Sequence, residues 1–346
     1  MSPVMPRGYH SAIEYQYSEE QGDAIVRIAS YHRKEFCTAV ISFPPGEHDS
    51  IRSSIATPFR QAPDTGLGSL QRLPLELLDN VVLSLDMNSL FIFRQVNLRC
   101  RELVDSLPQY QRVVAHGLDL FCALLRTELA IHIPLFNFDW ALCAKNCAFC
   151  GEFAGFVALL LWERCCFKCL RIARETQVQT LTATKRQFHF TKADINQLRS
   201  LKTLPGTYTM LGNVYKSRIT VVSAHQAVKI SGQPPPPRPG NSEQNQRFNF
   251  MAACALPYYD RRTGKVEHGM SCAGCQLALE RHIIGYRGES RDFAARDKVY
   301  SKDGFLKHFR WCEQAQLLWN SSEEGKIMPP ELPEAARQRG YFSNRE

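Results

Sequence analysis

Residues 67–104 read LGSLQRLPLELLDNVVLSLDMNSLFIFRQVNLRCRELV. Pro74 suits the first position of a helix, where a missing N–H costs nothing, and Glu76 places a carboxylate in the first turn. Residues 86–89 then interrupt the helical pattern with side chains that favour turns and N-caps. The apolar residues before this break recur at helical spacing and form one broad stripe: Leu73, Leu77, Leu78, Val81, Val82 and Leu85. The stretch predicts three small amphipathic helices, too small to bury their own stripes, so we expect the unit to dock onto another surface.

The residues of this stretch resemble the F-box family. Three segments follow one another at the spacing typical of that family. They are LPLELL, the acidic turn before Leu90, and FRQVNLRCREL. The resemblance implies a three-helix unit that binds a Skp-family adaptor and so joins a cullin ubiquitin ligase. It implies an adaptor-binding surface made of Leu73, Pro74, Leu77, Leu78, Leu90 and Val96. The sequence departs from the family at Cys100, where many F-boxes carry a tryptophan. Periodicity alone also allows a helical hairpin in the core of a larger domain.

Length and charge set the broad class. A chain of 346 residues predicts two or three compact units. Its net charge is +8, and the charged residues are expected to be scattered along the chain rather than concentrated in blocks. Scattered basic charge is weak evidence for an acidic partner or nucleic acid. The first residues lack a signal-peptide core, and the longest apolar run, residues 153–162, is shorter than the ~20 residues that span a bilayer. We expect an intracellular protein, cytoplasmic and/or nuclear, without contact to a membrane.

Thirteen cysteines, an odd number grouped into C-x2-C pairs, favour metal binding over a disulfide framework. Fifteen residues separate the pair Cys147 and Cys150 from the pair Cys166 and Cys169. This spacing predicts a closed structural zinc site with four thiolate ligands and no open position for a substrate. Cys165 is an alternative ligand to its neighbour Cys166.

A second candidate site lies near the C-terminus. Cys272 and Cys275 form another C-x2-C pair, and His308 and Cys312 follow after a gap of 32 residues. At i and i+4 of one helix, His308 and Cys312 would point from the same face. We therefore expect a Cys3His zinc site, which makes one or two structural zinc ions in all. The alternative ligands here are Cys254, His268 and His282.

The chain as a whole predicts an α+β fold that is mostly α, with the three-helix F-box-like unit followed by a zinc-stapled mixed α/β region. The β-prone runs 24–31 and 36–43 would suit a β-hairpin, and the apolar run 153–162 is expected to be helical. The expected units are an N-terminal extension (1–66), the F-box (67–115), a four-cysteine zinc-binding module (116–230), a proline-rich flexible linker (231–247), a Cys3His segment (248–320) and a polar tail (321–346).

The order of these motifs gives a second resemblance. Along the chain, the F-box-like helices are followed by three motifs. In order, these are C-x2-CG…C-x2-CL, PGTY and C-x-G-C…H-x3-C. This order resembles filamentous-fungal F-box proteins with two cysteine-rich segments. Such proteins recruit partners that are mostly unassigned, so this resemblance implies no particular substrate.

The leading functional hypothesis is a substrate receptor of an SCF ubiquitin ligase. The F-box would bind the adaptor, and the zinc-stapled region would bind an unknown protein substrate. The alternative is a zinc-dependent nucleic-acid-binding or scaffold protein in which the F-box-like helices are only structural. For it we consider the basic residues around the first cysteine pairs: Lys145, Arg164, Lys168, Arg171 and Arg174. We expect no catalytic residues, because the RING, zinc-deaminase and phosphate-loop patterns are all incomplete.

Overall fold

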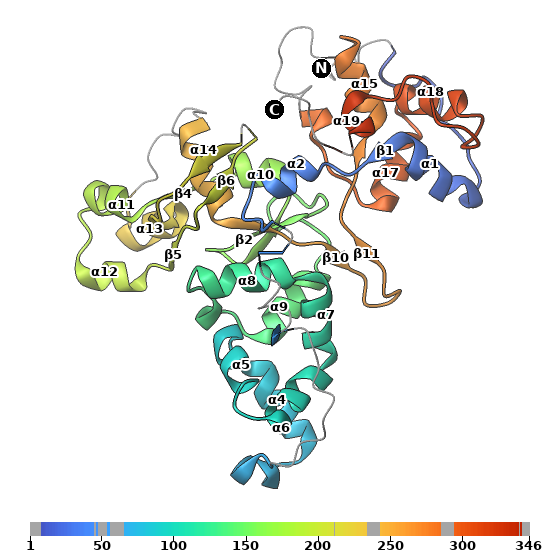
Figure 1. Ribbon diagram of the computed structural model, residues 1–346. Helices are drawn as coiled ribbons and strands as arrows, with labels where there is room; N and C mark the ends of the chain where they lie inside the picture. Colours follow the sequence, from blue (N-terminus) through green and yellow to red (C-terminus); the bar gives the residue numbers. More distant parts are fainter. Residues whose placement is uncertain are drawn as a thin grey trace.

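The computed structural model describes residues 8–44, 46–47, 54–55, 66–210, 212–233, 243–284, 294–338 and 340. It confirms the α+β class, with a helical region between residues 68 and 143 followed by a mixed region (Figure 1). Across these described ranges, no helix has the length and apolar character needed to span a bilayer.

The three predicted helices are α4 (Leu75–Ser84), α5 (Met87–Phe93) and α6 (Leu98–Ser106), preceded by the short 3-10 helix η2 (Gly68–Arg72). Side chains at the breaks cap α5 and α6. The Asp86 carboxylate accepts hydrogen bonds from the backbone N–H groups of Asn88 (3.0 Å) and Ser89 (2.9 Å), and the Asn97 side chain accepts one from Cys100 (2.8 Å). Because each turn satisfies helix-end donors, three short helices form where the sequence pattern indicates them.

Four further helical segments join these helices to the rest of the molecule: α7 (Pro108–His116), α8 (Leu118–Arg126), η3 (Ala130–His132) and α9 (Leu135–Cys143). One apolar cluster runs from Leu78, Val82 and Leu90 through Phe121 and Phe138 into the mixed region. The F-box-like helices therefore share a core with the mixed region.

A three-stranded antiparallel sheet lies at the centre of the mixed region, in the order β3 (Glu163–Cys165), β2 (Phe156–Ala158), β9 (Ala253–Ala255). Phe156 is in register with Cys165 on one side and Ala255 on the other. The expectation that residues 153–162 are helical is wrong. Strand β2 is buried on both faces, and a short, wholly apolar run suits such a strand as well as a buried helix.

A second antiparallel sheet has the order β4 (Val178–Thr180), β8 (Thr220–Ser223), β5 (Ser200–Lys202). The helices α11 (Leu181–Phe188), α12 (Lys192–Gln197) and α13 (Ala224–Ser231) pack on one face, where Val222 joins Phe188. Val221, the neighbouring residue on β8, points into the main core instead. The hairpin β6 (Gly206–Tyr208) and β7 (Asn213–Tyr215) and the helices α10 (Phe167–Ile172) and α14 (Glu243–Met251) complete this part.

The N-terminal residues do not form the expected β-hairpin. They form η1 (Glu19–Gln21), α1 (Gly22–Ala29), β1 (Ser30–Tyr31) and α2 (Lys34–Thr38). Ile25, Ile28 and Ala29, at helical spacing, are all buried in one cluster with residues of the C-terminal helices. A partner distant in sequence thus selects a helix where the β-prone residue types favoured a strand.

These N-terminal elements complete the C-terminal module. Strand β1 pairs antiparallel with β12 (Ser271–Cys272), and α1 packs on α17 (Lys302–Phe309) and α18 (Glu313–Ser321) (Figure 1). The module also contains α15 (Ala273–Glu280), the pair β10 (Tyr258–Tyr259) and β11 (Val266–Glu267), and α19 (Glu334–Arg337). Ala335 of the expected polar tail is buried against Leu277 and Leu318. Residues 234–242 of the expected linker lie outside the described residues, and residues 243–247 begin α14.

Candidate functional site

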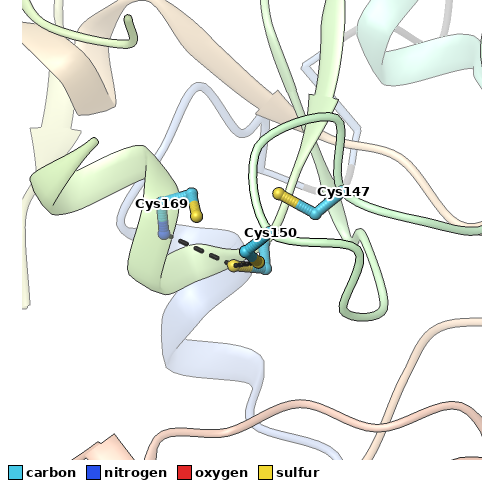
Figure 2. Close-up of side chains that lie close together, drawn as sticks. Cys147, Cys150 and Cys169 are labelled. Atoms are coloured by element: carbon cyan, nitrogen blue, oxygen red, sulfur yellow. Dashed lines mark hydrogen bonds between the residues drawn. The ribbon is translucent and has the colours of Figure 1, made fainter. Parts of the chain in front are cut away.

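The first cysteine cluster joins a loop to a helix end. Cys147 and Cys150 lie on the loop before β2, close to Cys169 of α10 (Figure 2). Cys166 is the N-cap of α10, one turn before Cys169. The four sulfur atoms lie within 4.8 Å of one another, and Cys150 Sγ is 3.6 Å from Cys166 Sγ. Gly151 closes the loop with a φ of +74°, a conformation that glycine adopts without strain.

The structure separates the two candidate ligands Cys165 and Cys166. Cys165 is the last residue of β3, and its buried side chain points into the main core, outside the cluster. Cys166 follows at the start of α10, where its sulfur also accepts a hydrogen bond from the N–H of Cys169 (3.4 Å). Its hydrogen bond to Cys147 lowers the pKa of the Cys147 thiol to about 4 and raises the pKa of Cys166. A lowered thiol pKa favours the thiolate form, which is the form that binds a metal cation.

The second cluster is almost entirely buried. Cys272 is the N-cap of α15, with Cys275 one turn later, and their partners His308 and Cys312 lie at the end of α17 and the start of α18. The four ligand atoms lie within 4.8 Å, with Cys272 Sγ 3.7 Å from Cys312 Sγ and Cys275 Sγ 3.3 Å from His308 Nε2. The expectation that His308 and Cys312 share one helix is wrong, because α17 ends at Phe309 and a tight turn carries the chain to Cys312.

Two residues that the sequence analysis did not single out shape this second cluster. The Tyr9 hydroxyl lies 3.5 Å from Cys275 Sγ, so the N-terminal segment covers the cluster directly. Gly274, between the two cysteines, lets α15 approach α18 closely. A Cβ there would lie 2.2 Å from the backbone nitrogen of Ala315. The glycine of C-A-G-C was visible in the sequence, but its helix partner was not.

Both donor sets fit structural zinc. A tetrahedral ion with Zn–S bonds of about 2.3 Å places its sulfur ligands about 3.8 Å apart, close to the spacings of 3.6 Å and 3.7 Å found here. A disulfide would need about 2.05 Å. The alternative ligands of the second site do not join it: Cys254 lies in β9, and His268 and His282 fall outside both groups. Four protein ligands would leave no open position, so such a site supplies folding free energy rather than catalysis.

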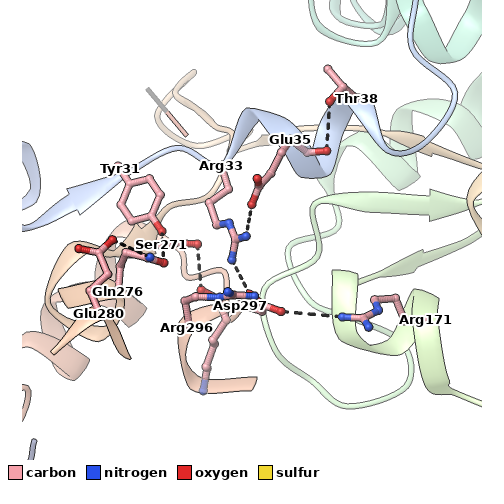
Figure 3. A network of polar contacts seen from close by, with 11 residues as sticks. Tyr31, Arg33, Glu35, Thr38, Arg171, Ser271, Gln276, Glu280, Arg296 and Asp297 are labelled. Carbon is pink, nitrogen blue, oxygen red and sulfur yellow. Dashed lines mark hydrogen bonds and ion pairs between the residues drawn. The ribbon is translucent and has the colours of Figure 1, made fainter. Parts of the chain in front are cut away.

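A buried polar network ties the two cysteine modules together (Figure 3). Arg33 is buried and donates to Asp297, which also pairs with Arg171 of α10 at 3.8 Å. The Arg33 guanidinium lies 4.0 Å over the ring of Phe36, which stacks at 3.7 Å on Phe167, the residue after Cys166. The N-terminal segment therefore contacts both modules and connects them.

The helix α4 presents an unusual apolar face. Leu77 and Val81, one turn apart, are 50% and 48% exposed, and Leu73 and Pro74 before the helix are exposed as well. Val96, after α5, is 65% exposed. We call these residues, with Ile92, the α4–α5 surface: Leu73, Pro74, Leu77, Val81, Ile92 and Val96. Exposed apolar side chains grouped in one part of a domain are a feature of interaction sites.

Two of the predicted surface residues are in the interior. Leu78 is 6% exposed and Leu90 is fully buried, so both stabilise the domain instead of presenting a surface, and the prediction is wrong for them. Val81 and Ile92 are exposed in their place, a distinction that apolar periodicity alone does not make. Cys100 is buried in α6, so the departure from the usual tryptophan lies inside the domain.

The basic residues considered around the first cysteine pairs do not form a free surface. Arg164 is buried and donates to the carbonyl oxygens of Leu256 (2.7 Å) and Ala154. Lys145 pairs with two carboxylates, at 3.6 Å and 3.8 Å, and Arg171 pairs with Asp297. Of the five residues, Lys168 and Arg174 are exposed, and the other three have partners within the protein.

Comparison with known proteins agrees with the geometry of the helical region. A family model described as "F-box domain" matches residues 70–112, which span α4, α5, α6 and the start of α7. Neither the curated proteins nor the solved structures contain a match to the chain. The chain is thus an F-box domain-containing protein.

Proposed function

We propose that this protein is the substrate-recruiting subunit of an SCF-type cullin ubiquitin ligase, and that its F-box binds a Skp-family adaptor. The α4–α5 surface is the observation that carries this proposal. Leu77 and Val81 are exposed on α4, Leu73 just before it and Val96 after α5, while the inner faces of these helices pack into the shared core. Burying such a surface against a groove in a partner protein gives a helix-in-groove contact, driven by apolar area.

The remainder of the chain acts as the body that displays an unidentified protein substrate. Structural zinc in the two cysteine clusters, with the Arg33 network between them, makes that body rigid. We propose no chemistry for the protein itself, because closed ligand sets offer no site for a reacting molecule. Catalysis then belongs to the ubiquitin-transferring partners.

The test is co-purification with a Skp-type adaptor expressed in the same cells. The wild-type chain should retain the adaptor, and the double variant Leu73→Glu/Val81→Glu should lose it, because both charges fall in the α4–α5 surface. The matched control, Ile172→Glu/Leu317→Glu, places two charges on apolar residues that are similarly exposed in other modules. Failure of the folded wild-type protein to retain the adaptor would overturn the proposal, as would equal loss in both variants.

A further inference from the structure

The positive charge of this protein is concentrated in one module. Between residues 177 and 233 the chain has eight lysines and arginines and one acidic residue, Asp194, which leaves a net charge of +7. The whole chain carries +8, so its remainder is close to neutral. The sequence expectation of scattered charge is wrong for this segment, which we call the basic module. It comprises the β4-β8-β5 sheet, the helices α11 to α13 and the β6–β7 hairpin.

The charges lie on the outer side of the module. Lys185 and Arg186 belong to α11, Lys192 begins α12 and Lys229 lies on α13, and all four side chains are exposed. Figure 1 shows these three helices at the left edge of the molecule, away from the F-box helices. Lys216 and Arg218, between β7 and β8, add two more exposed charges.

These cations lack protein counter-charges. Within the described part of the chain, Lys202 is the one basic side chain of the module with an ion pair, to Glu128 at 2.9 Å. The Asp194 carboxylate is used locally, as it accepts hydrogen bonds from the N–H (2.9 Å) and hydroxyl (2.7 Å) of Thr191. Outside the module, several basic side chains have carboxylate partners, for example Lys298 with Glu152 at 2.8 Å. A solvated face normally mixes both signs, so an unbalanced face of this extent indicates a polyanionic ligand.

The aromatic residues distinguish between kinds of polyanion. Proteins that bind single strands stack bases on exposed aromatic rings. Here Phe188 and Tyr208 are buried, Phe190 and Tyr215 are half-buried, and no aromatic ring among the described residues of the module is fully exposed. Lysine and arginine side chains on a helical layer instead suit the regular phosphates of a double helix. We propose that the basic module binds the phosphate backbone of duplex DNA without reading its sequence.

The test uses the full-length protein and a fluorescently labelled duplex of about 20 base pairs, with anisotropy measured across a salt series. The wild type should bind, and the logarithm of its affinity should fall linearly with the logarithm of the salt concentration. The variant Lys185→Gln/Arg186→Gln/Lys192→Gln/Lys229→Gln should bind about tenfold more weakly or worse, and its salt slope should be smaller by about 3.6 if all four charges contact phosphates. All four residues are exposed, so the fold and adaptor binding should be unchanged.

The matched control removes four exposed charges outside the module: Lys168→Gln/Arg174→Gln/Lys307→Gln/Lys326→Gln. Its affinity for the duplex should stay within about twofold of the wild type, because binding depends on the charges of the basic module and not on the net charge of the protein. Equal weakening in both variants would overturn the proposal, as would absence of binding at low salt. Tighter binding of a single strand or of polyglutamate than of the duplex would also overturn it. Adaptor co-purification is a separate readout, so this proposal and the proposed function can fail independently.

Discussion

At the scale of single residues, the spacing of cysteines and histidine predicted which residues form the two clusters. It did not predict where each side chain points. The C-x2-C pairs and the His308–Cys312 spacing select the same eight residues that the structure brings together. The choice between Cys165 and Cys166 needed the fold, because the boundary between β3 and α10 falls between them. Gly274 likewise acquires its role only when α18 lies against α15.

The adjacent cysteines give a paired prediction. Cys166→Ser should lose one bound zinc and much of the stability of the four-cysteine module, because structural zinc contributes to folding. Cys165→Ser should keep the metal and lose about 1–3 kcal/mol, because it buries a hydroxyl in an apolar core. Metal analysis of the purified proteins with thermal unfolding checks both. Loss of metal in Cys165→Ser alone would reverse our assignment.

Gly274 gives a second prediction at this scale. Gly274→Ala should destabilise the protein by about 3 kcal/mol, because its Cβ would overlap the backbone of Ala315. The control is Gly155→Ala, whose Cβ would meet no atom within 4 Å and should change stability by less than about 0.5 kcal/mol. Denaturant unfolding measures the difference, and equal effects would contradict the close packing of α15 on α18.

At the scale of elements, the sequence predicted what local signals determine. The F-box helices were predictable because their apolar period and their capping residues agree. Helix α1 was missed because its β-branched residue types favour a strand, although Ile25, Ile28 and Ala29 recur at helical spacing, and its packing partner lies almost 300 residues away. Strand β2 was missed because a short apolar run has no period at all.

Helix α4 supplies a prediction from two neighbouring leucines. Leu77→Ala should weaken adaptor binding about tenfold and leave stability nearly unchanged, since the side chain is half-exposed. Leu78→Ala should instead cost about 2–5 kcal/mol of stability, because it opens a cavity in the shared core. Adaptor titration and denaturant unfolding, performed on both variants, separate the two effects. An unchanged adaptor affinity in Leu77→Ala would remove this residue from the interface.

At the scale of the whole molecule, the order of modules along the chain is not their order in space. The sequence divided the chain into successive units, whereas the structure builds the Cys3His module from both ends of the described chain. Local patterns carry no information about such pairing, because the strands β1 and β12 are two residues long each. The concentration of charge between residues 177 and 233, by contrast, could have been found by counting charge in windows.

Deletion of residues 1–31 therefore tests whether the Cys3His module needs the N-terminal segment to bind zinc. The truncated protein should bind one zinc fewer, since Tyr9, α1 and β1 all pack on the Cys3His cluster, and it should retain the adaptor. A milder version compares Ile25→Ala, at a buried position, with Ile13→Ala, at a position 81% exposed. The first should lose about 2–5 kcal/mol of stability and the second almost none. Unchanged metal content after the deletion would refute the shared module.

This pairing of distant segments also sets an order of events during synthesis. The apolar face of α1 leaves the ribosome before its partners α17 and α18, which follow roughly 280 residues later, on the order of tens of seconds at typical translation rates. During that interval Ile25 and Ile28 have no native surface to cover them, so the nascent chain is prone to aggregation or chaperone capture. A chain that stalls before residue 302 keeps this face exposed permanently, which makes incomplete copies recognisable to quality control.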